Sequence, residues 1–194
     1  MNEILGSAAR PLILASQSPR RREILEKLGL TFSVCPAQSE VAIDAGLPLC
    51  EAVKAVARAK AEEIAAENPG CAVLGADTVV ALGETVLGKP HDEAEAKEML
   101  KLLSGNDHRV VTAVWVVDET GAGHGFASDN RVTFAPLSDE DIDGYVKTGE
   151  PMDKAGAYGI QGIGGRFVTK ISGDFYAIMG LPCGELRLFL REIS

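Results

Sequence analysis

A strand-to-helix junction near the N-terminus constrains the fold of this chain most strongly. The apolar run 12–14 begins a short buried strand predicted over 12–16, Ser18 suits a helix N-cap, and Pro19 suits the first helical position. The helix predicted over 19–28 is followed by Gly29, a common termination signal. A buried strand that leads directly into a helix is typical of α/β proteins, in which helices cover a central sheet.

The first turn of this predicted helix carries three arginines, Arg20, Arg21 and Arg22. The N-terminus of a helix has a partial positive charge and unpaired N–H groups, so it favours anions and disfavours cations. An external anion, most simply a phosphate, would complete the arrangement. The alternative is that three solvated arginines tolerate a small penalty, since each such interaction is worth only about 0.3–1 kcal/mol.

The composition excludes several classes of protein. A net charge of −9 argues against general binding to nucleic acid or anionic membranes, although it leaves room for a small basic pocket. No apolar run approaches the roughly 18 residues of a membrane span, and the N-terminus lacks a secretory pattern. We therefore expect a cytoplasmic protein with reduced, mostly buried thiols and no zinc site, because its cysteines are scattered: Cys35, Cys50, Cys71 and Cys183.

The rest of the chain shows alternating strand and helix patterns. Helices are predicted at 49–67, 92–104, 139–147 and from 182, and strands at 31–35, 71–75, 79–82, 108–117, 125–134, 166–171 and 175–179. The strands 108–117 and 125–134 should form an antiparallel pair. No repeat and no convincing linker divides the sequence, so a single domain over 1–194 is expected.

Asp77 follows the strand predicted at 71–75. A carboxylate at a strand end can bind a divalent metal or activate water, because strand ends line the ligand crevice of α/β sheets. The alternative is a turn or capping aspartate. Lys60, Lys89 and Glu40 are also open to two interpretations, either as contacts to phosphate, metal or water or as solvated surface charges.

The stretch 150–165 contains five glycines and one proline, which oppose regular structure. Such a loop is usually either functional or a connector. Within it, Gln161 offers one acceptor and two donors, which suits reading the edge of a nucleobase. The phosphate-binding loop, the dinucleotide fingerprint and the nucleophile elbow are all missing. Phosphate-ester chemistry with a metal fits these residues, but the substrate does not follow from them.

Taken together, these segments resemble the Maf family, the septum-formation-type nucleoside triphosphate pyrophosphatases. The matching pieces stand in family order: Leu-Ala-Ser-Gln-Ser-Pro-Arg-Arg at 14–21, Ala-Arg-Ala-Lys-Ala at 57–61, Gly-Ala-Asp-Thr-Val at 75–79, Gly-Lys-Pro at 88–90, Leu-Ser-Gly at 103–105, Glu-Pro-Met-Asp-Lys-Ala-Gly-Ala-Tyr-Gly-Ile-Gln-Gly at 150–162 and Gly-Leu-Pro at 180–182. The resemblance implies an α/β fold like that of inosine triphosphatase-type proteins, with a mixed, strongly twisted sheet flanked by helices and two lobes around a cleft. It also suggests a homodimer.

The resemblance further implies hydrolysis of a nucleoside triphosphate to the monophosphate and pyrophosphate with a divalent metal, Mg²⁺ or Mn²⁺. By position, Asp77 resembles the family's general base, and Asp77 and Glu40 its metal ligands. Where the family usually shows an acidic pair, this chain has Ser39-Glu40-Val41. The other residues that match the family's catalytic and substrate-binding set are Ser16, Arg20, Arg21, Lys60, Thr78, Lys89 and Gln161.

Three positions separate the two branches of the family. The branch that resembles 7-methyl-GTP pyrophosphatases carries an aromatic residue, Gln and Glu where this chain has Arg20, Thr78 and Gln161. We therefore predict dTTP and UTP as substrates and a role in removing noncanonical or surplus nucleotides. From the charge and the lack of a membrane span, we predict no nucleic-acid or membrane partner. The alternatives are a 7-methyl-GTP or purine nucleotide pyrophosphatase and a non-catalytic, nucleotide-binding regulator of septum formation.

Overall fold

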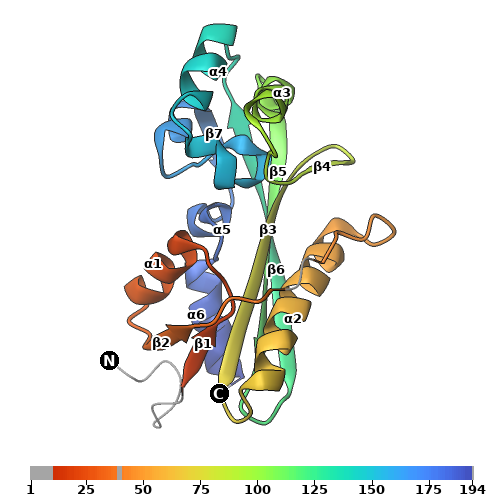
Figure 1. Cartoon of the computed structure of the whole chain (residues 1–194), viewed down its shortest axis with the longest axis vertical. Helices are drawn as coiled ribbons and strands as arrows, with labels where there is room; N and C mark the ends of the chain where they lie inside the picture. Colours follow the sequence, from red (N-terminus) through yellow and green to blue (C-terminus); the bar gives the residue numbers. More distant parts are fainter. Residues whose placement is uncertain (1–10, 39–40, 194) are drawn as a thin grey trace. The chain divides into compact units, whose positions relative to one another are not determined.

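The computed structural model describes residues 11–38 and 41–193, which form a mixed α/β architecture (Figure 1). The described strands make one sheet in the order β2-β1-β3-β5-β6-β7, and β4 pairs with β3 outside that path. The strands are β1 (Leu12–Leu14), β2 (Phe32–Val34), β3 (Ala72–Leu82), β4 (Thr85–Leu87), β5 (Asp107–Val117), β6 (Gly123–Phe134) and β7 (Val168–Ser172).

Helices precede or follow most of these strands. The α-helices are α1 (Pro19–Lys27), α2 (Leu49–Glu67), α3 (Glu93–Leu103), α4 (Asp139–Val146), α5 (Phe175–Met179) and α6 (Cys183–Glu192). Three short 3₁₀ helices occupy most of the glycine-rich stretch: η1 (Glu150–Asp153), η2 (Ala155–Ala157) and η3 (Ile163–Phe167). The sequence predicted no regular structure in this stretch. The structure differs in that three short 3₁₀ helices form there.

The chain divides into two compact units. The first contains the described residues up to Asp77 together with 112–128 and 180–193, and the second contains 78–111 and 129–179. The backbone passes from one unit to the other inside β3, β5 and β6, and a fourth time between Met179 and Gly180, directly after α5.

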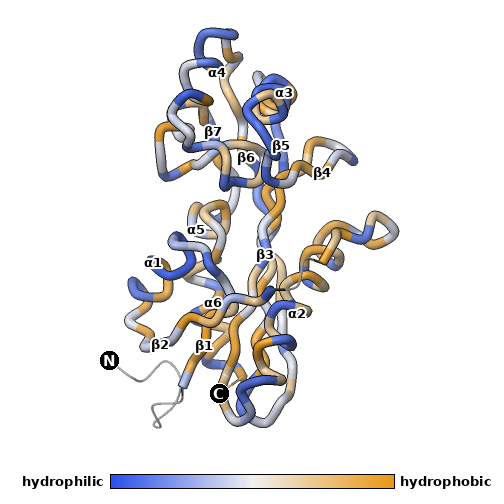
Figure 2. The backbone as a smooth tube through the Cα atoms, viewed as in Figure 1, coloured by the Kyte–Doolittle hydropathy of each residue, from blue (hydrophilic) through white to orange (hydrophobic). Residues whose placement is uncertain are grey.

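In the first unit, β1 lies between two parallel neighbours, with Leu14 in register with Val34 of β2 and with Leu74 of β3. Figure 2 shows β1 and the paired part of β3 as hydrophobic segments. Ile13 and Val73 pack with Ala61 and Ile64 of α2 in a cluster of buried side chains. Helix α2 thus buries β1 and the paired part of β3, and this burial explains their apolar sequences.

In the second unit, aromatic rings form the centre of the core. Phe134 packs edge-on against Tyr158 with ring centroids 4.7 Å apart, and Tyr145 packs edge-on against Phe167 at 5.2 Å. Leu100 and Leu103 of α3 and Ile142 of α4 complete the same cluster. A capping box formed by Ser138 and Asp141 begins α4.

Several elements confirm the sequence-based predictions. Helix α2 spans the predicted residues, and the Ser18 side chain caps α1 by accepting from the Arg21 N–H. Strands β5 and β6 are neighbours joined by the short turn 118–122, which only an antiparallel pair can use. The mixed sheet flanked by helices is also as predicted.

Three predictions about local structure are wrong. The expected strands 71–75 and 79–82 are one unbroken strand, β3, so Asp77 lies inside a strand and not at its end. Residues 175–179 form helix α5 and not a strand. The four cysteines are thiols and not disulfide-bonded, as expected, but they are half-buried rather than mostly buried, because none of them lies in the centre of a core cluster. Strand β4 had no sequence prediction.

A buried histidine gives the second unit a specific response to pH. His108 is 2% exposed, and its Nε2 lies 2.8 Å from the Tyr158 hydroxyl. Burial lowers the pKa of His108 from 6.5 to about 4. Since the unfolded chain takes up this proton below about pH 6.5 and the folded chain does not until about pH 4, folding stability falls across that window by up to roughly 3 kcal/mol.

We therefore expect the free energy of unfolding to decrease between pH 7 and pH 4.5 in wild type and to change less in His108→Gln, which has no imidazole to protonate. Tyrosine circular dichroism during urea unfolding measures this, because all three tyrosines belong to the second unit. The same pH dependence in both proteins would assign the effect to other groups.

The described part of the chain contains no helix that is long and apolar enough to cross a membrane.

Candidate active site

The loop that follows β1 is held in place by a buried arginine. Arg21 is 9% exposed, its Nε donates to the Gly180 carbonyl at 2.9 Å, and its Nη1 donates to Ser16 Oγ at 3.0 Å. Ser16 Oγ also accepts from the Ser18 N–H at 3.2 Å. Burial lowers the pKa of the Arg21 guanidinium, and the nearby Asp77 carboxylate opposes that shift. Arg21 thus fixes Ser16 and places a buried positive charge near Asp77.

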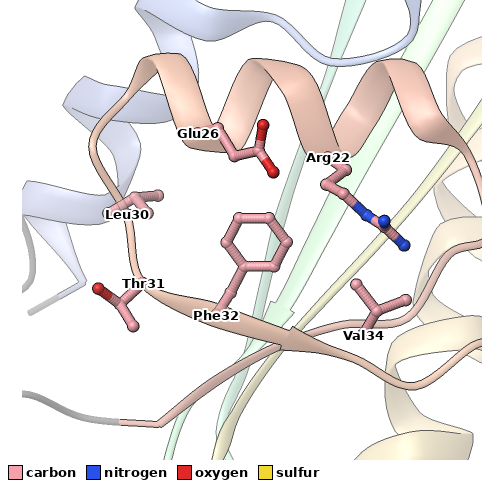
Figure 3. Close-up of a pocket in the computed structure, with 6 residues that line it drawn as sticks. All are labelled: Arg22, Glu26, Leu30, Thr31, Phe32 and Val34. Atoms are coloured by element: carbon pink, nitrogen blue, oxygen red, sulfur yellow. The ribbon is translucent and has the colours of Figure 1, made fainter.

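The three arginines at the start of α1, the hydrophilic turn visible in Figure 2, have three different surroundings. Arg21 is buried, Arg20 is half-buried, and Arg22 is exposed. Arg22 lies with Glu26 at a shallow surface hollow of about 440 Å³ between α1 and β2 (Figure 3), whose lining includes none of the predicted site residues. The exposed position of Arg22 agrees with a solvated charge.

The central feature of the site is an ion pair between a helix and the middle of a strand. Lys60 on α2 donates from Nζ to Oδ1 of Asp77 on β3 at 2.6 Å. The two side chains are only 25% and 18% exposed, so water screens this pair less than it screens a surface salt bridge. The predicted lysine and the predicted carboxylate are thus in direct contact.

Gly75 allows this contact by bringing α2 close to β3. A Cβ atom at position 75 would lie 2.4 Å from the Ala57 carbonyl oxygen and 2.8 Å from the Ala61 nitrogen, both backbone atoms of α2. Only glycine fits such an approach. Lys60 precedes Ala61 in α2, and Asp77 lies two residues beyond Gly75 in β3. The close approach at Gly75 therefore also sets the distance between the backbones that carry Lys60 and Asp77.

Asp77 could hold a divalent metal together with a substrate. Glu40, the other predicted ligand, lies outside the described residues. Across residues 11–38 and 41–193, no three His, Cys, Asp or Glu side chains gather in a metal-binding group. Mg²⁺, however, is usually bound by one or two carboxylates with waters and substrate phosphates rather than by a full protein cage. Lys60 engages only Oδ1 of Asp77, so this donor set fits a metal of that kind.

The other predicted site residues belong to the second unit. Thr78 follows Asp77 on β3 and is half-buried. Lys89 is exposed in the connection between β4 and α3, and Gln161 is exposed between η2 and η3. The structure therefore brings together four predicted site residues in the first unit: Ser16, Arg21, Lys60 and Asp77. Thr78, Lys89 and Gln161 lie in the second unit.

The glycine-rich stretch surrounds a carboxylate that the sequence did not single out. Glu150 accepts from the Ile163 N–H at 2.9 Å, from the Gly164 N–H at 3.0 Å and from the Tyr145 hydroxyl at 2.8 Å. Burial alone would raise the pKa of Glu150, but the Gly164 and Ile163 N–H groups and the Tyr145 hydroxyl hold it below the usual value. The only signal in the sequence was an acidic residue at the beginning of the stretch.

Comparison with known proteins gives consistent relatives. A family model described as Maf-like protein matches residues 11–193. The chain is 47% identical over 183 residues to a dTTP/UTP pyrophosphatase from Bacillus velezensis, a match that covers 94% of this chain and 96% of that protein. It is 48% identical over 185 residues to a dTTP/UTP pyrophosphatase from Aquifex aeolicus, covering 94% and 95% of the two chains.

Among solved structures, the chain is similar to a HAM1 protein from Coxiella burnetii. The TM-score is 0.56 at 17% sequence identity, and the match covers 94% of this chain and 99% of that one. At this identity the likeness concerns the fold alone, and it agrees with the α/β architecture that the sequence predicted.

Proposed function

Because this chain belongs to the family of Maf-like proteins, we propose that it hydrolyses nucleoside triphosphates, with dTTP and UTP preferred, to the monophosphate and pyrophosphate. The observation that carries this proposal is the Lys60–Asp77 pair beside the buried guanidinium of Arg21. A carboxylate held among cations is suited to activating water next to a polyanionic substrate. The names of the two relatives support the choice of dTTP and UTP.

Asp77 is the general base of the proposed reaction. Its carboxylate accepts a proton from a water molecule whose oxygen attacks the α-phosphorus. The bond from that phosphorus to the oxygen bridging the β-phosphate then breaks, and pyrophosphate leaves. Lys60 holds Oδ1 of Asp77 and so fixes the orientation of the carboxylate. Such positioning matters because a general base works only within hydrogen-bond reach of the proton that it removes.

We assign the triphosphate to the cationic and hydroxyl side chains of the site: Ser16, Arg20, Arg21, Lys60 and Lys89. Phosphoryl and nucleotidyl transfer depend mostly on positioning and on neutralising charge, which these groups provide. Two donors of Arg21 already serve Gly180 and Ser16, so it contributes buried charge and the position of Ser16. A divalent cation, Mg²⁺ or Mn²⁺, held by Asp77 and Glu40 would supply further charge neutralisation.

Base selection is assigned to Arg20, Thr78 and Gln161, the three positions at which this chain matches the dTTP/UTP branch. The exposed amide of Gln161 carries an acceptor and donors, which complement the O4 and N3 edge of uracil or thymine. Hydrolysis of these nucleotides suits the removal of noncanonical or surplus nucleotides before they enter nucleic acid.

A substrate panel tests the proposal. With Mg²⁺ or Mn²⁺, kcat/KM for dTTP and UTP should exceed that for 7-methyl-GTP by at least about tenfold, because a site built to hydrogen-bond one base edge leaves its polar groups unpaired with another. The products should be the monophosphate and pyrophosphate, identified by chromatography. The opposite ranking would favour the 7-methyl-GTP alternative, and nucleotide binding without turnover would favour a non-catalytic regulator.

A further inference from the structure

We propose that Glu150 is a positioning residue for base recognition, because its carboxylate holds the turn Gly159–Gly164 in the shape that presents Gln161 to the nucleobase. The proposal rests on the function assigned above, in which Gln161 reads the base. It extends that function to a residue that touches neither the substrate nor the reacting atoms.

Glu150 and Tyr145 fasten the turn at both of its ends. At one end, the Tyr145 hydroxyl accepts from the Gly159 N–H at 3.1 Å. At the other end, Oε2 and Oε1 of Glu150 accept from the N–H groups of Ile163 and Gly164. The Tyr145 hydroxyl in turn donates to Oε1 of Glu150, so the two fastenings are linked. Gln161 lies halfway between them in the sequence.

The glycines of the turn show how closely the backbone wraps this carboxylate. A Cβ atom at Gly162 would lie 2.4 Å from Oε2 of Glu150, and one at Gly164 would lie 2.5 Å from the Tyr145 hydroxyl oxygen. Real Cβ atoms do not approach other atoms so closely, so residues with side chains would force the turn away from Glu150. Contact with Glu150 and Tyr145 thus explains the glycines at positions 162 and 164.

The chemistry of position 150 requires an ionised carboxylate. Hydrogen bonds hold the pKa of Glu150 below its usual value despite its burial, so at neutral pH it offers only acceptors to its three donors. Charge-assisted bonds of this kind are about twice as strong as neutral ones. A glutamine amide would place an N–H donor against the N–H of Ile163 or Gly164, although it has nearly the same size. Glu150→Gln therefore loosens the turn without leaving a cavity.

Binding measurements test this inference separately from hydrolysis. The probes are non-hydrolysable α,β-methylene analogues of UTP and GTP, and calorimetry gives the two dissociation constants. A purine is larger than a pyrimidine, so a turn held in one position should favour the UTP analogue, and a loosened turn should discriminate less. We expect Glu150→Gln to reduce the preference roughly tenfold, the size of one hydrogen bond in affinity. Tyr145→Phe, which keeps the ring packing, should act in the same direction.

A double-mutant cycle shows whether Glu150 acts through Gln161. Gln161→Ala alone should reduce the preference, and adding Glu150→Gln to it should reduce the preference no further. Glu95→Gln is the matched control, because Glu95 accepts from the His91 N–H at 2.7 Å in the same unit but does not contact the turn. The proposal is overturned if Glu150→Gln weakens the binding of both analogues equally, or if the double variant loses the product of the two single-variant losses in preference. It is also overturned if wild type shows no preference for the UTP analogue. Failure of wild type to release pyrophosphate would instead refute the proposed function.

Discussion

Replacing Asp77 with asparagine is expected to lower kcat for dTTP and UTP by roughly 10²- to 10⁴-fold, the usual contribution of a general base. Asparagine keeps the shape of the side chain and can still accept from Lys60 Nζ, but it has no carboxylate to take the proton of the attacking water. Nucleotide affinity should change much less, because the other proposed phosphate contacts remain. Steady-state pyrophosphate release measures kcat, and calorimetry with a non-hydrolysable UTP analogue measures affinity.

Asp129→Asn is the control for this experiment. Asp129 also lies on a strand and pairs with a cation, Arg109, at 2.8 Å, but it belongs to no predicted site. The kcat of Asp129→Asn should equal that of wild type. If Asp77→Asn keeps near-normal kcat, the general base is another group, and Glu40 is the next carboxylate to test. If both kcat and affinity collapse, Asp77 is needed mainly to assemble the site.

The position of Asp77 shows where sequence reasoning about local structure fails. Glycine and aspartate have low strand propensity, so the Gly75–Thr78 region predicted a break between two short strands. In the structure, β3 continues through it, with buried residues at Ala76 and Val79 on either side of the half-buried pair. Tertiary packing overrides propensity here, because Gly75 is required for contact with α2 and Asp77 has Lys60 as its partner.

The prediction of a strand at 175–179, where the structure has helix α5, fails for a different reason. A run of five largely apolar residues at 175–179 does not reveal its period, so strand and helix were equally compatible with it. The deciding residue is Asp174, whose Oδ1 accepts from the N–H groups of Tyr176 and Ala177 and so begins a helix. Long periodic segments such as α2 carry enough turns to be predicted, and single-turn elements depend on one capping side chain.

The candidate site was predictable only in part. Motifs identified Lys60 and Asp77 separately, yet they are 17 residues apart, and only the packing of α2 on β3 shows that they pair. Glu150 was missed because two of its three donors are backbone N–H groups of a later loop, which leave no side-chain pattern in the sequence. Such contacts depend on the fold and so appear only with coordinates.

Gly75→Ala is expected to lower the free energy of unfolding of the first unit by about 1–3 kcal/mol, the usual cost of overpacking a core. The added methyl group would meet the backbone of α2 at Ala57 and Ala61 and not a movable side chain, so the helix itself must shift. That shift moves Lys60 away from Asp77, so kcat should fall as well. Trp115 fluorescence in urea reports the change, because this sole tryptophan packs against the cluster that contains Ala61.

Gly184→Ala provides the comparison for this substitution within the same unit. Gly184 lies in α6, and a Cβ atom there would meet nothing within 4 Å. Alanine is the better helix former by up to about 1 kcal/mol, so this variant should be as stable as wild type or slightly more stable, with unchanged kcat. If Gly75→Ala behaves in the same way, the close approach of α2 does not set the Lys60–Asp77 contact. A loss of stability with normal kcat would mean that the ion pair adjusts to the displaced helix.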